Sequence, residues 1–129
     1  MIERYTLPEI GKIWSEENKF STWLEIEILA CEARAHAGEI PMELVKEIRQ
    51  KAKFDVKRIL EIEEDVKHDV IAFLTNVAEN VGESAKHIHY GMTSSDILDT
   101  ALAVQMKQAG ELILEKMEEL TGLIFDQRI

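Results

Sequence analysis

The chain has few of the residues that interrupt helices or that mark all-β and disordered proteins. Its 129 residues include two prolines, six glycines and 6% aromatic residues, whereas 46% of the residues are hydrophobic. Turn-rich β proteins and disordered linkers usually contain more proline and glycine, so this composition favours helices. A chain of this length is large enough to bury a continuous core, and a single folded unit is the default expectation.

Cysteine and positive charge are also scarce. Cys31 is the only cysteine, so no disulfide forms within the chain, and no cysteine–histidine spacing typical of a zinc site occurs. The 25 acidic residues outnumber the 15 basic ones and give a net charge of −10. This balance argues against nucleic-acid binding, because phosphate recognition depends on lysine and arginine.

Long hydrophobic runs are missing as well. No apolar run approaches the roughly 20 residues that span a bilayer. The first residues, Met1–Arg4, do not resemble the start of a secretory signal. Together with the single cysteine, these absences predict a soluble cytoplasmic protein without membrane or nucleic-acid partners.

Capping residues divide the N-terminal part of the chain into four predicted helices. Serine, aspartate and proline are common at helix starts, and glycine at helix ends. The predicted starts are Ser15, Pro41, Asp55 and Asp69, and the first and fourth helices are predicted to end at Gly38 and Gly82. The first of them, over residues 16–37, carries apolar side chains on two sides, so we expect it to contact more than one neighbour.

A much longer helix is predicted to begin near Thr93–Asp96. Its apolar residues recur three or four positions apart, at Leu98, Leu102, Met106, Ala109, Ile113, Met117, Leu120 and Ile124. The mean spacing of about 3.7 residues keeps this stripe on one face of a nearly straight helix, as in a helical bundle. The earlier helices are too few to cover it, and residues 126–129 contain no glycine cap and no turn residues. We therefore expect the chain to be an N-terminal fragment of a longer protein.

Polar groups concentrate at residues 87–96, immediately before this helix. Two histidines, a tyrosine and three hydroxyl residues occur there. Free backbone N–H groups and the positive end of the helix dipole favour a carboxylate or phosphate. We expect the hydroxyls of Thr93 and Ser94 to cap the helix and also to donate to a ligand. We assign Asp96 to structure, because it would repel an anion. We expect Gly91 either to adopt a positive φ or to let a ligand approach the backbone closely.

The candidate residues also have ordinary structural explanations. Arg4 fits a solvated arginine near a terminus, Asp69 fits a helix cap, and an isolated histidine such as His68 is more often structural than functional. His87 and His89 lack a third ligand at suitable spacing, so no metal site is expected. We expect His87 to lie at the surface.

Four motifs resemble those of the bacterial and archaeal adenylosuccinate lyases, in the same order and at the same spacing. They are Ile2–Tyr5, Trp23–Glu27, His68–Phe73 and His89–Asp96. The similarity extends over the whole chain, which corresponds to only the first part of such an enzyme. The broader aspartase/fumarase superfamily shares the helical architecture and a hydroxyl-rich turn, whereas the first and third motifs favour the adenylosuccinate branch.

The resemblance implies an all-α fold with two parts. Short N-terminal helices within residues 1–92 would carry part of the substrate site, and the long helix in residues 93–129 would begin a central helical bundle. The family is homotetrameric, and each of its active sites is assembled from several subunits. No metal or organic cofactor is expected.

The resemblance also implies a C–N lyase. Such enzymes cleave adenylosuccinate to AMP and fumarate by β-elimination, and act likewise on the succinylated carboxamide intermediate of purine biosynthesis. In the family, the acid and base belong to a later histidine segment and a mobile serine loop, which this sequence does not contain. The fragment alone is therefore expected to be inactive.

The substrate contacts of the family are carried over by position. They fall on Arg4, Tyr5, Lys67, His68, Asp69, His89, Thr93 and Ser94. His68 is expected close to the reacting succinyl group, in a supporting catalytic role. Relatives commonly have arginine at position 67, where Lys67 keeps the charge but not the planar fork of donors.

Two other functions stay open at this point. One is a different superfamily lyase that acts on another amino-acid or dicarboxylate adduct. Arg4, Tyr5 and His68 discriminate against it, because a nucleotide phosphate needs them and a small dicarboxylate does not. The other is a non-enzymatic helical assembly module, in which the histidines and hydroxyls are caps and surface groups.

Overall fold

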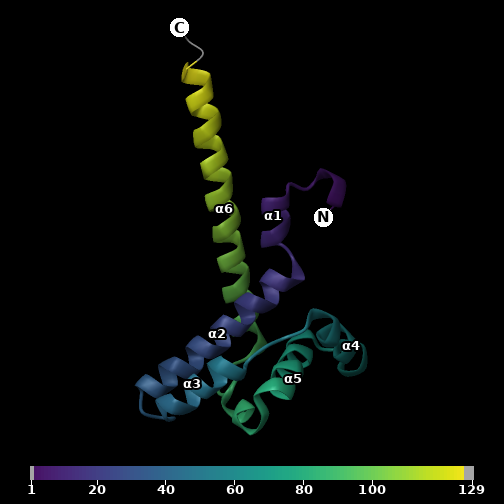
Figure 1. The fold of residues 1–129 in the computed structure, drawn as a ribbon, viewed down its shortest axis with the longest axis vertical. Helices are drawn as coiled ribbons and strands as arrows, with labels where there is room; N and C mark the ends of the chain where they lie inside the picture. Colours follow the sequence, from purple (N-terminus) through teal and green to yellow (C-terminus); the bar gives the residue numbers. More distant parts are fainter. Residues whose placement is uncertain (1, 127–129) are drawn as a thin grey trace.

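Every regular element in the computed structural model, which describes residues 2–126, is a helix (Figure 1). The elements are η1 (Glu3–Tyr5), α1 (Pro8–Ile13), α2 (Glu16–His36), α3 (Met42–Lys51), α4 (Val56–Val66), α5 (Asp69–Val81), η2 (Gly82–His87) and α6 (Ser94–Asp126). The all-α class and the long final helix predicted from the sequence are confirmed. The short helices η1, α1 and η2 were not predicted, because so few residues show no clear periodicity.

Most of the predicted caps are present. The Ser15 hydroxyl accepts a hydrogen bond from the Asn18 N–H at 3.1 Å, and the Asp55 carboxylate accepts one from the Arg58 N–H at 2.8 Å. The end of α2 is followed by Gly38 with φ +79°, a backbone conformation that glycine adopts without strain.

The prediction that Asp69 caps α5 is wrong. His68 occupies the N-cap position instead, and its Nδ1 accepts a hydrogen bond from the Ile71 N–H at 3.3 Å. Asp69 is the first residue of the helix, and its carboxylate accepts a hydrogen bond from the Val70 N–H at 2.7 Å. An imidazole nitrogen with a lone pair can replace the usual hydroxyl or carboxylate oxygen at this position.

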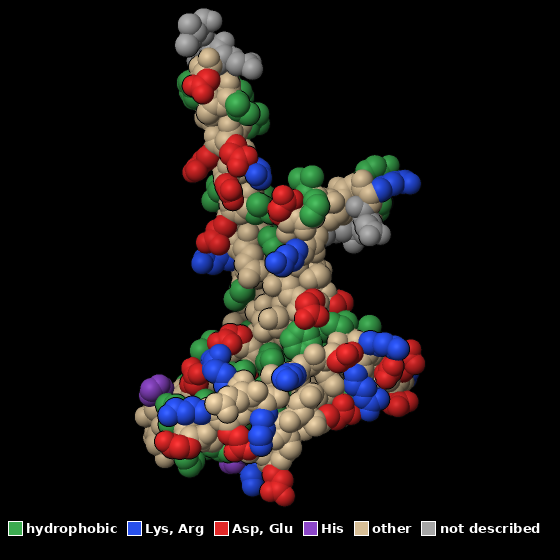
Figure 2. Space-filling view, in the orientation of Figure 1, with side chains coloured by type: hydrophobic (Ala, Val, Ile, Leu, Met, Phe, Trp, Pro, Cys, Tyr) green, Lys and Arg blue, Asp and Glu red, His purple; other side chains and the backbone are tan. Residues whose placement is uncertain are grey.

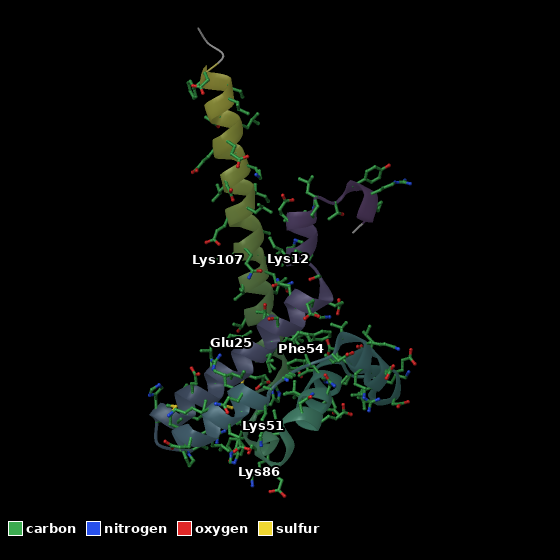
Figure 3. All side chains as sticks on the ribbon, viewed as in Figure 1. Lys12, Glu25, Lys51, Phe54, Lys86 and Lys107 are labelled. Carbon is green, nitrogen blue, oxygen red and sulfur yellow. The ribbon has the colours of Figure 1, made fainter. Side chains whose placement is uncertain are left out.

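An aromatic cluster joins α2 to α5 at the centre of the core. The Phe73 ring stacks on Phe20 with centroids 5.8 Å apart and meets Trp23 edge-on at 5.4 Å. Phe54, labelled in Figure 3, extends the cluster at 6.2 Å from Phe20. Such aromatic pairs contribute about 0.5–1.5 kcal/mol beyond their buried area. The cluster therefore fixes α5, whose N-cap residue is His68, against α2.

The first half of α6 packs on α2 and α1, whereas the second half extends away from the body (Figure 1). Its buried side chains are Ile97, Ala101, Gln105 and Ala109. The Gln105 side-chain amide donates to the Ile13 carbonyl at 2.8 Å. Small residues at this face let the helices approach closely.

The predicted apolar stripe of α6 is mostly not the face that the other helices cover. Only Ala109 of that stripe is buried and Leu98 partly buried. Its exposed members are Leu102, Met106, Ile113, Met117, Leu120 and Ile124. Figure 2 shows hydrophobic side chains along the projecting part of the helix, interspersed with acidic ones. The described chain thus leaves most of a long apolar face exposed, and α1 borders part of it, where Leu7 and Ile10 line an open groove together with Ile113, Met117 and Leu120.

Among the described residues, no helix is both long enough and apolar enough to cross a membrane.

Candidate functional site

The residues carried over by the resemblance lie in three separate places. Arg4 and Tyr5 belong to η1, residues 67–69 form the turn between α4 and α5, and His89, Thr93 and Ser94 precede or begin α6. Figure 1 shows η1 at the level of the projecting α6, away from α4 and α5. Within residues 2–126, no hydrogen bond or ion pair links one group with another. In the same range, no three acidic, histidine or cysteine residues lie together as metal ligands.

Arg4 and Tyr5 are exposed and interact with each other. The Arg4 guanidinium lies over the Tyr5 ring, 4.8 Å from its centroid. An exposed cation–π contact of this kind contributes about 0.5–1 kcal/mol, so it orients the guanidinium without blocking its donors. A guanidinium in this state can hold a phosphate through two parallel hydrogen bonds.

The turn between α4 and α5 presents His68 at the surface. Lys67 has a left-handed backbone with φ 54°, and its N–H donates to the Glu63 carbonyl at 2.9 Å, which ends α4. The chain then reverses, and His68 opens α5 with its side chain 46% exposed. Because Nδ1 is used in the cap, Nε2 is the imidazole atom left for a ligand.

The surroundings of Lys67 are acidic. Its side chain lines an open groove together with Leu60, Glu63 and Glu64. Because two carboxylates lie beside one ammonium group, this groove attracts an anion only weakly. Lys67 would thus need further positive charge nearby to hold a substrate carboxylate or phosphate.

His89 is held by a carboxylate that the sequence reasoning missed. Glu27 of α2 is completely buried, with 0% of its side chain exposed. Its Oε2 accepts a hydrogen bond from the His89 backbone N–H at 2.8 Å, and its Oε1 lies 2.6 Å from His89 Nδ1. A buried glutamate is rare unless it is paired, so this pair explains why an acidic residue sits among the apolar residues of α2.

The Glu27–His89 pair also controls the backbone. His89 has φ 60°, a left-handed conformation that costs a non-glycine residue about 1–2 kcal/mol. The hydrogen bond from its N–H to Glu27 offsets this cost and places the ring. Burial raises the pKa of the Glu27 carboxyl group, while the hydrogen bonds and the charge of His89 act in the opposite direction.

Two further residues of α2 hold the same segment. The His87 carbonyl accepts hydrogen bonds from Cys31 Sγ at 3.5 Å and from Arg34 Nη1 at 3.1 Å. The Arg34 guanidinium also lies 4.3 Å from the centroid of the Tyr90 ring. Glu27, Cys31 and Arg34 follow at helical spacings of four and three, so one face of α2 fixes residues 87–90. A glutamate within an apolar stripe was the signal that could have revealed this face.

The start of α6 is capped differently from the prediction. The Thr93 N–H donates to the Asp96 carboxylate at 2.8 Å, and the Asp96 N–H donates to the Thr93 carbonyl at 3.0 Å. The expectation that the Thr93 and Ser94 hydroxyls cap the helix is wrong, since neither makes a hydrogen bond within the described part of the chain. The structural role assigned to Asp96 is confirmed, as is the positive φ of Gly91, at 78°.

We expect the Cys31 thiol to react with Ellman's reagent at least about 100-fold more slowly in the folded chain than in urea. The thiol is buried, so the reaction requires a local opening of the structure, and each of about 1.4 kcal/mol of opening free energy slows it tenfold. Burial, followed by the charge of Glu27, raises the pKa of this thiol. Absorbance of the released thiolate measures both rates. Equal rates would show that α2 does not hold residues 87–90 closed over Cys31.

Comparisons with known proteins agree with the motifs. The chain matches the family described as "Lyase" over residues 3–128. It is 61% identical over 124 residues to the adenylosuccinate lyase of Synechocystis sp. and 53% identical over 124 residues to that of Bacillus subtilis. Each alignment covers 96% of this chain, which spans 29% of the length of these relatives.

A solved structure shows the same fold. The crystal structure of a fumarate lyase from Mesorhizobium sp. BNC1 superposes with a TM-score of 0.77 and 25% identity. The match covers 84% of this chain and 26% of that one. The resemblance inferred from the four motifs is thus confirmed by overall sequence and by fold, and the chain belongs to the lyase family.

Proposed function

We propose that this chain supplies part of the substrate site of a cytoplasmic adenylosuccinate lyase. The observation that carries the proposal is the 61% identity over 124 residues to the Synechocystis protein of that name. In this proposal the whole enzyme releases fumarate from adenylosuccinate to leave AMP, and does the same to the succinylated carboxamide intermediate of purine biosynthesis.

The reaction sets clear chemical requirements. A base removes a proton from the carbon beside a carboxylate, the C–N bond breaks, and an acid protonates the departing nitrogen. Donors must also hold the charge that develops on the carboxylate. The residues described above supply donors, whereas the resemblance assigns the acid and the base to other parts of the enzyme.

The proposed contacts divide by chemistry. Arg4, with Tyr5 beside it, would hold the phosphate, and His68 Nε2 would donate to a succinyl carboxylate as a supporting catalytic group. The remaining proposed contacts are Lys67, Asp69, His89, Thr93 and Ser94. The unengaged hydroxyls at the positive end of α6 suit an anion there. No metal or organic cofactor is required by these roles.

The separation of the three groups supports a site shared between copies of the chain. The net charge of −10 makes one chain a poor host for a substrate with a phosphate and two carboxylates. The exposed apolar stripe of α6 offers the surface on which copies would pack, and three of its members, Ile113, Met117 and Leu120, line an apolar groove between α1 and α6. We propose a homotetramer in which residues 1–92 carry site residues and residues 93–129 begin a shared bundle.

A chimera tests the proposal. If this chain replaces the matching segment of the Synechocystis enzyme, the chimera should cleave adenylosuccinate. His68→Ala and Arg4→Ala should each lower kcat/KM by roughly 10- to 150-fold, the equivalent of about 1.5–3 kcal/mol for one charged hydrogen bond. Fumarate release followed by absorbance gives the rates, and circular dichroism checks the fold.

Matched controls separate site effects from general ones. His36→Ala removes an exposed histidine at the end of α2, and Lys57→Ala removes an exposed cation on α4, so both should leave the kinetics unchanged. Unchanged kinetics in the His68 and Arg4 variants would contradict the site assignment. A chimera that cleaves only another dicarboxylate adduct would identify a different superfamily lyase, and one without any lyase activity would favour an assembly module.

A further inference from the structure

The two site histidines use the same ring atom for opposite hydrogen bonds. His68 Nδ1 lies 3.3 Å from the Ile71 backbone nitrogen, and His89 Nδ1 lies 2.6 Å from Glu27 Oε1. In both rings Nε2 makes no hydrogen bond within the described residues. The partner of Nδ1 therefore decides what each Nε2 offers to a ligand.

At His68 the partner is a donor. The Ile71 N–H can only donate, so Nδ1 accepts from it and carries no proton. Asp69 Oδ1 also lies near Nδ1, at 3.5 Å, but this oxygen already accepts a hydrogen bond from the Val70 N–H at 2.7 Å. The neutral ring then has its proton on Nε2. His68 consequently presents an N–H donor at the surface of the turn between α4 and α5.

At His89 the partner is an acceptor. Glu27 Oε2 already accepts the hydrogen bond from the His89 backbone N–H, and among the described residues this fully buried carboxylate has no hydrogen-bond partner besides His89. An imidazole is ordinarily more basic than a carboxylate by about two pKa units. Burial raises the pKa of Glu27, but both of its oxygens contact His89, and these hydrogen bonds favour the charged carboxylate, so we place the proton between Oε1 and Nδ1 on the ring. The neutral ring then carries its proton on Nδ1, and Nε2 is bare.

We propose that the fold holds His68 and His89 as opposite tautomers and that Glu27 is the positioning residue that sets the second one. His68 then offers a donor suited to a substrate carboxylate, whereas His89 offers a nitrogen that accepts a hydrogen bond or a proton. Glu27 acts only through His89. The roles toward substrate rest on the proposed function, but the tautomers themselves do not.

Nitrogen NMR of the chain tests the tautomers without any ligand. Long-range proton–nitrogen correlations distinguish a protonated ring nitrogen from a bare one. They are recorded at about pH 8, where an imidazole with the ordinary pKa of about 6.5 is neutral. His68→Asn and His89→Asn assign the signals. The expected spectrum shows a bare Nδ1 in His68 and a bare Nε2 in His89. A proton on Nε2 of His89, as a neutral Glu27 donating to Nδ1 would produce, overturns the proposal.

Glu27→Gln provides the decisive variant. Its side-chain carbonyl can still accept from the His89 N–H, while its amide can donate to Nδ1, so the packing is kept and the tautomer reverses. The ratio of Nδ1-protonated to Nε2-protonated His89 should fall by at least about tenfold, because a charge-assisted hydrogen bond is lost. His68 should not change. An unchanged His89 signal would contradict the role of Glu27.

Glu25→Gln is the matched control. Glu25 lies on the outer side of α2, where it pairs with Arg49, and is labelled in Figure 3. This substitution removes the same charge from the same helix and should leave both histidines unchanged. If Glu27→Gln does not fold, the wild-type spectrum alone still decides the tautomer of His89.

The chimera separates this inference from the proposed function. There, Glu27→Gln should lower kcat by about tenfold or more with a smaller change in KM, since it alters the state of a positioned ring rather than removing it. A chimera that does not cleave adenylosuccinate counts against the proposed function. Spectra with the expected tautomers would still establish the positioning by Glu27 in that case.

Discussion

Replacing Phe73 with alanine is expected to lower the free energy of unfolding by about 3–5 kcal/mol. Phe73 is 0% exposed and contacts both Phe20 and Trp23, so the substitution leaves a cavity where α2 and α5 meet. Small domains are stable by only about 5–15 kcal/mol, and this loss is a large fraction of that. Urea denaturation followed by circular dichroism measures the change.

Ile71→Ala is the control for Phe73. Ile71 lies on the same helix but is 46% exposed, and alanine keeps the backbone N–H that caps α5 through His68. We expect a loss below about 1 kcal/mol, as is usual for exposed positions. Similar losses for the two substitutions would show that the aromatic cluster does not anchor α5. The turn that carries His68 would then need another explanation for its position.

Introducing charge on the apolar stripe of α6 is expected to abolish self-association. Met117 and Leu120 are both more than half exposed in the single chain. Burying each such side chain between copies contributes about 1.5–3 kcal/mol, so Met117→Lys with Leu120→Lys should raise the dissociation constant by at least about 10²-fold. Sedimentation velocity at several concentrations should show an oligomer for the parent chain and a monomer for the double variant.

Substitutions on the opposite face of α6 control for general charge effects. Glu115→Gln and Glu118→Gln lie across the helix from the stripe and should leave the oligomer intact. A parent chain that is monomeric at all concentrations would contradict the shared bundle proposed for residues 93–129. A double variant that assembles like the parent would show that the copies meet through another surface.

Local signals in the sequence were sufficient for the helical framework. The scarcity of glycine and proline favoured helices throughout. The caps at Ser15 and Asp55 and the glycine after α2 each lie within a few residues of the helix end that they define. Apolar periodicity likewise revealed the long final helix. The four motifs identified the family, because their residues keep the family's order and spacing in this chain.

The candidate site depended more on contacts between distant residues. The sequence reasoning selected His68 and His89, but it assigned the cap of α5 to Asp69 and gave Glu27 no role. Glu27 and His89 are 62 positions apart, and no periodicity or capping rule connects them. Only the packing of residues 87–90 on α2 shows that a buried carboxylate holds this histidine.

The sequence by itself determined the helical class, most helix ends and the lyase family, because these depend on local preferences and on residue order. Tertiary structure decided which nitrogen each histidine leaves free, which face of α6 the chain covers, and how far apart the proposed contacts lie. These properties depend on which surfaces meet when the helices pack. That choice is made by the summed contacts of residues far apart in the chain, which a local pattern does not record.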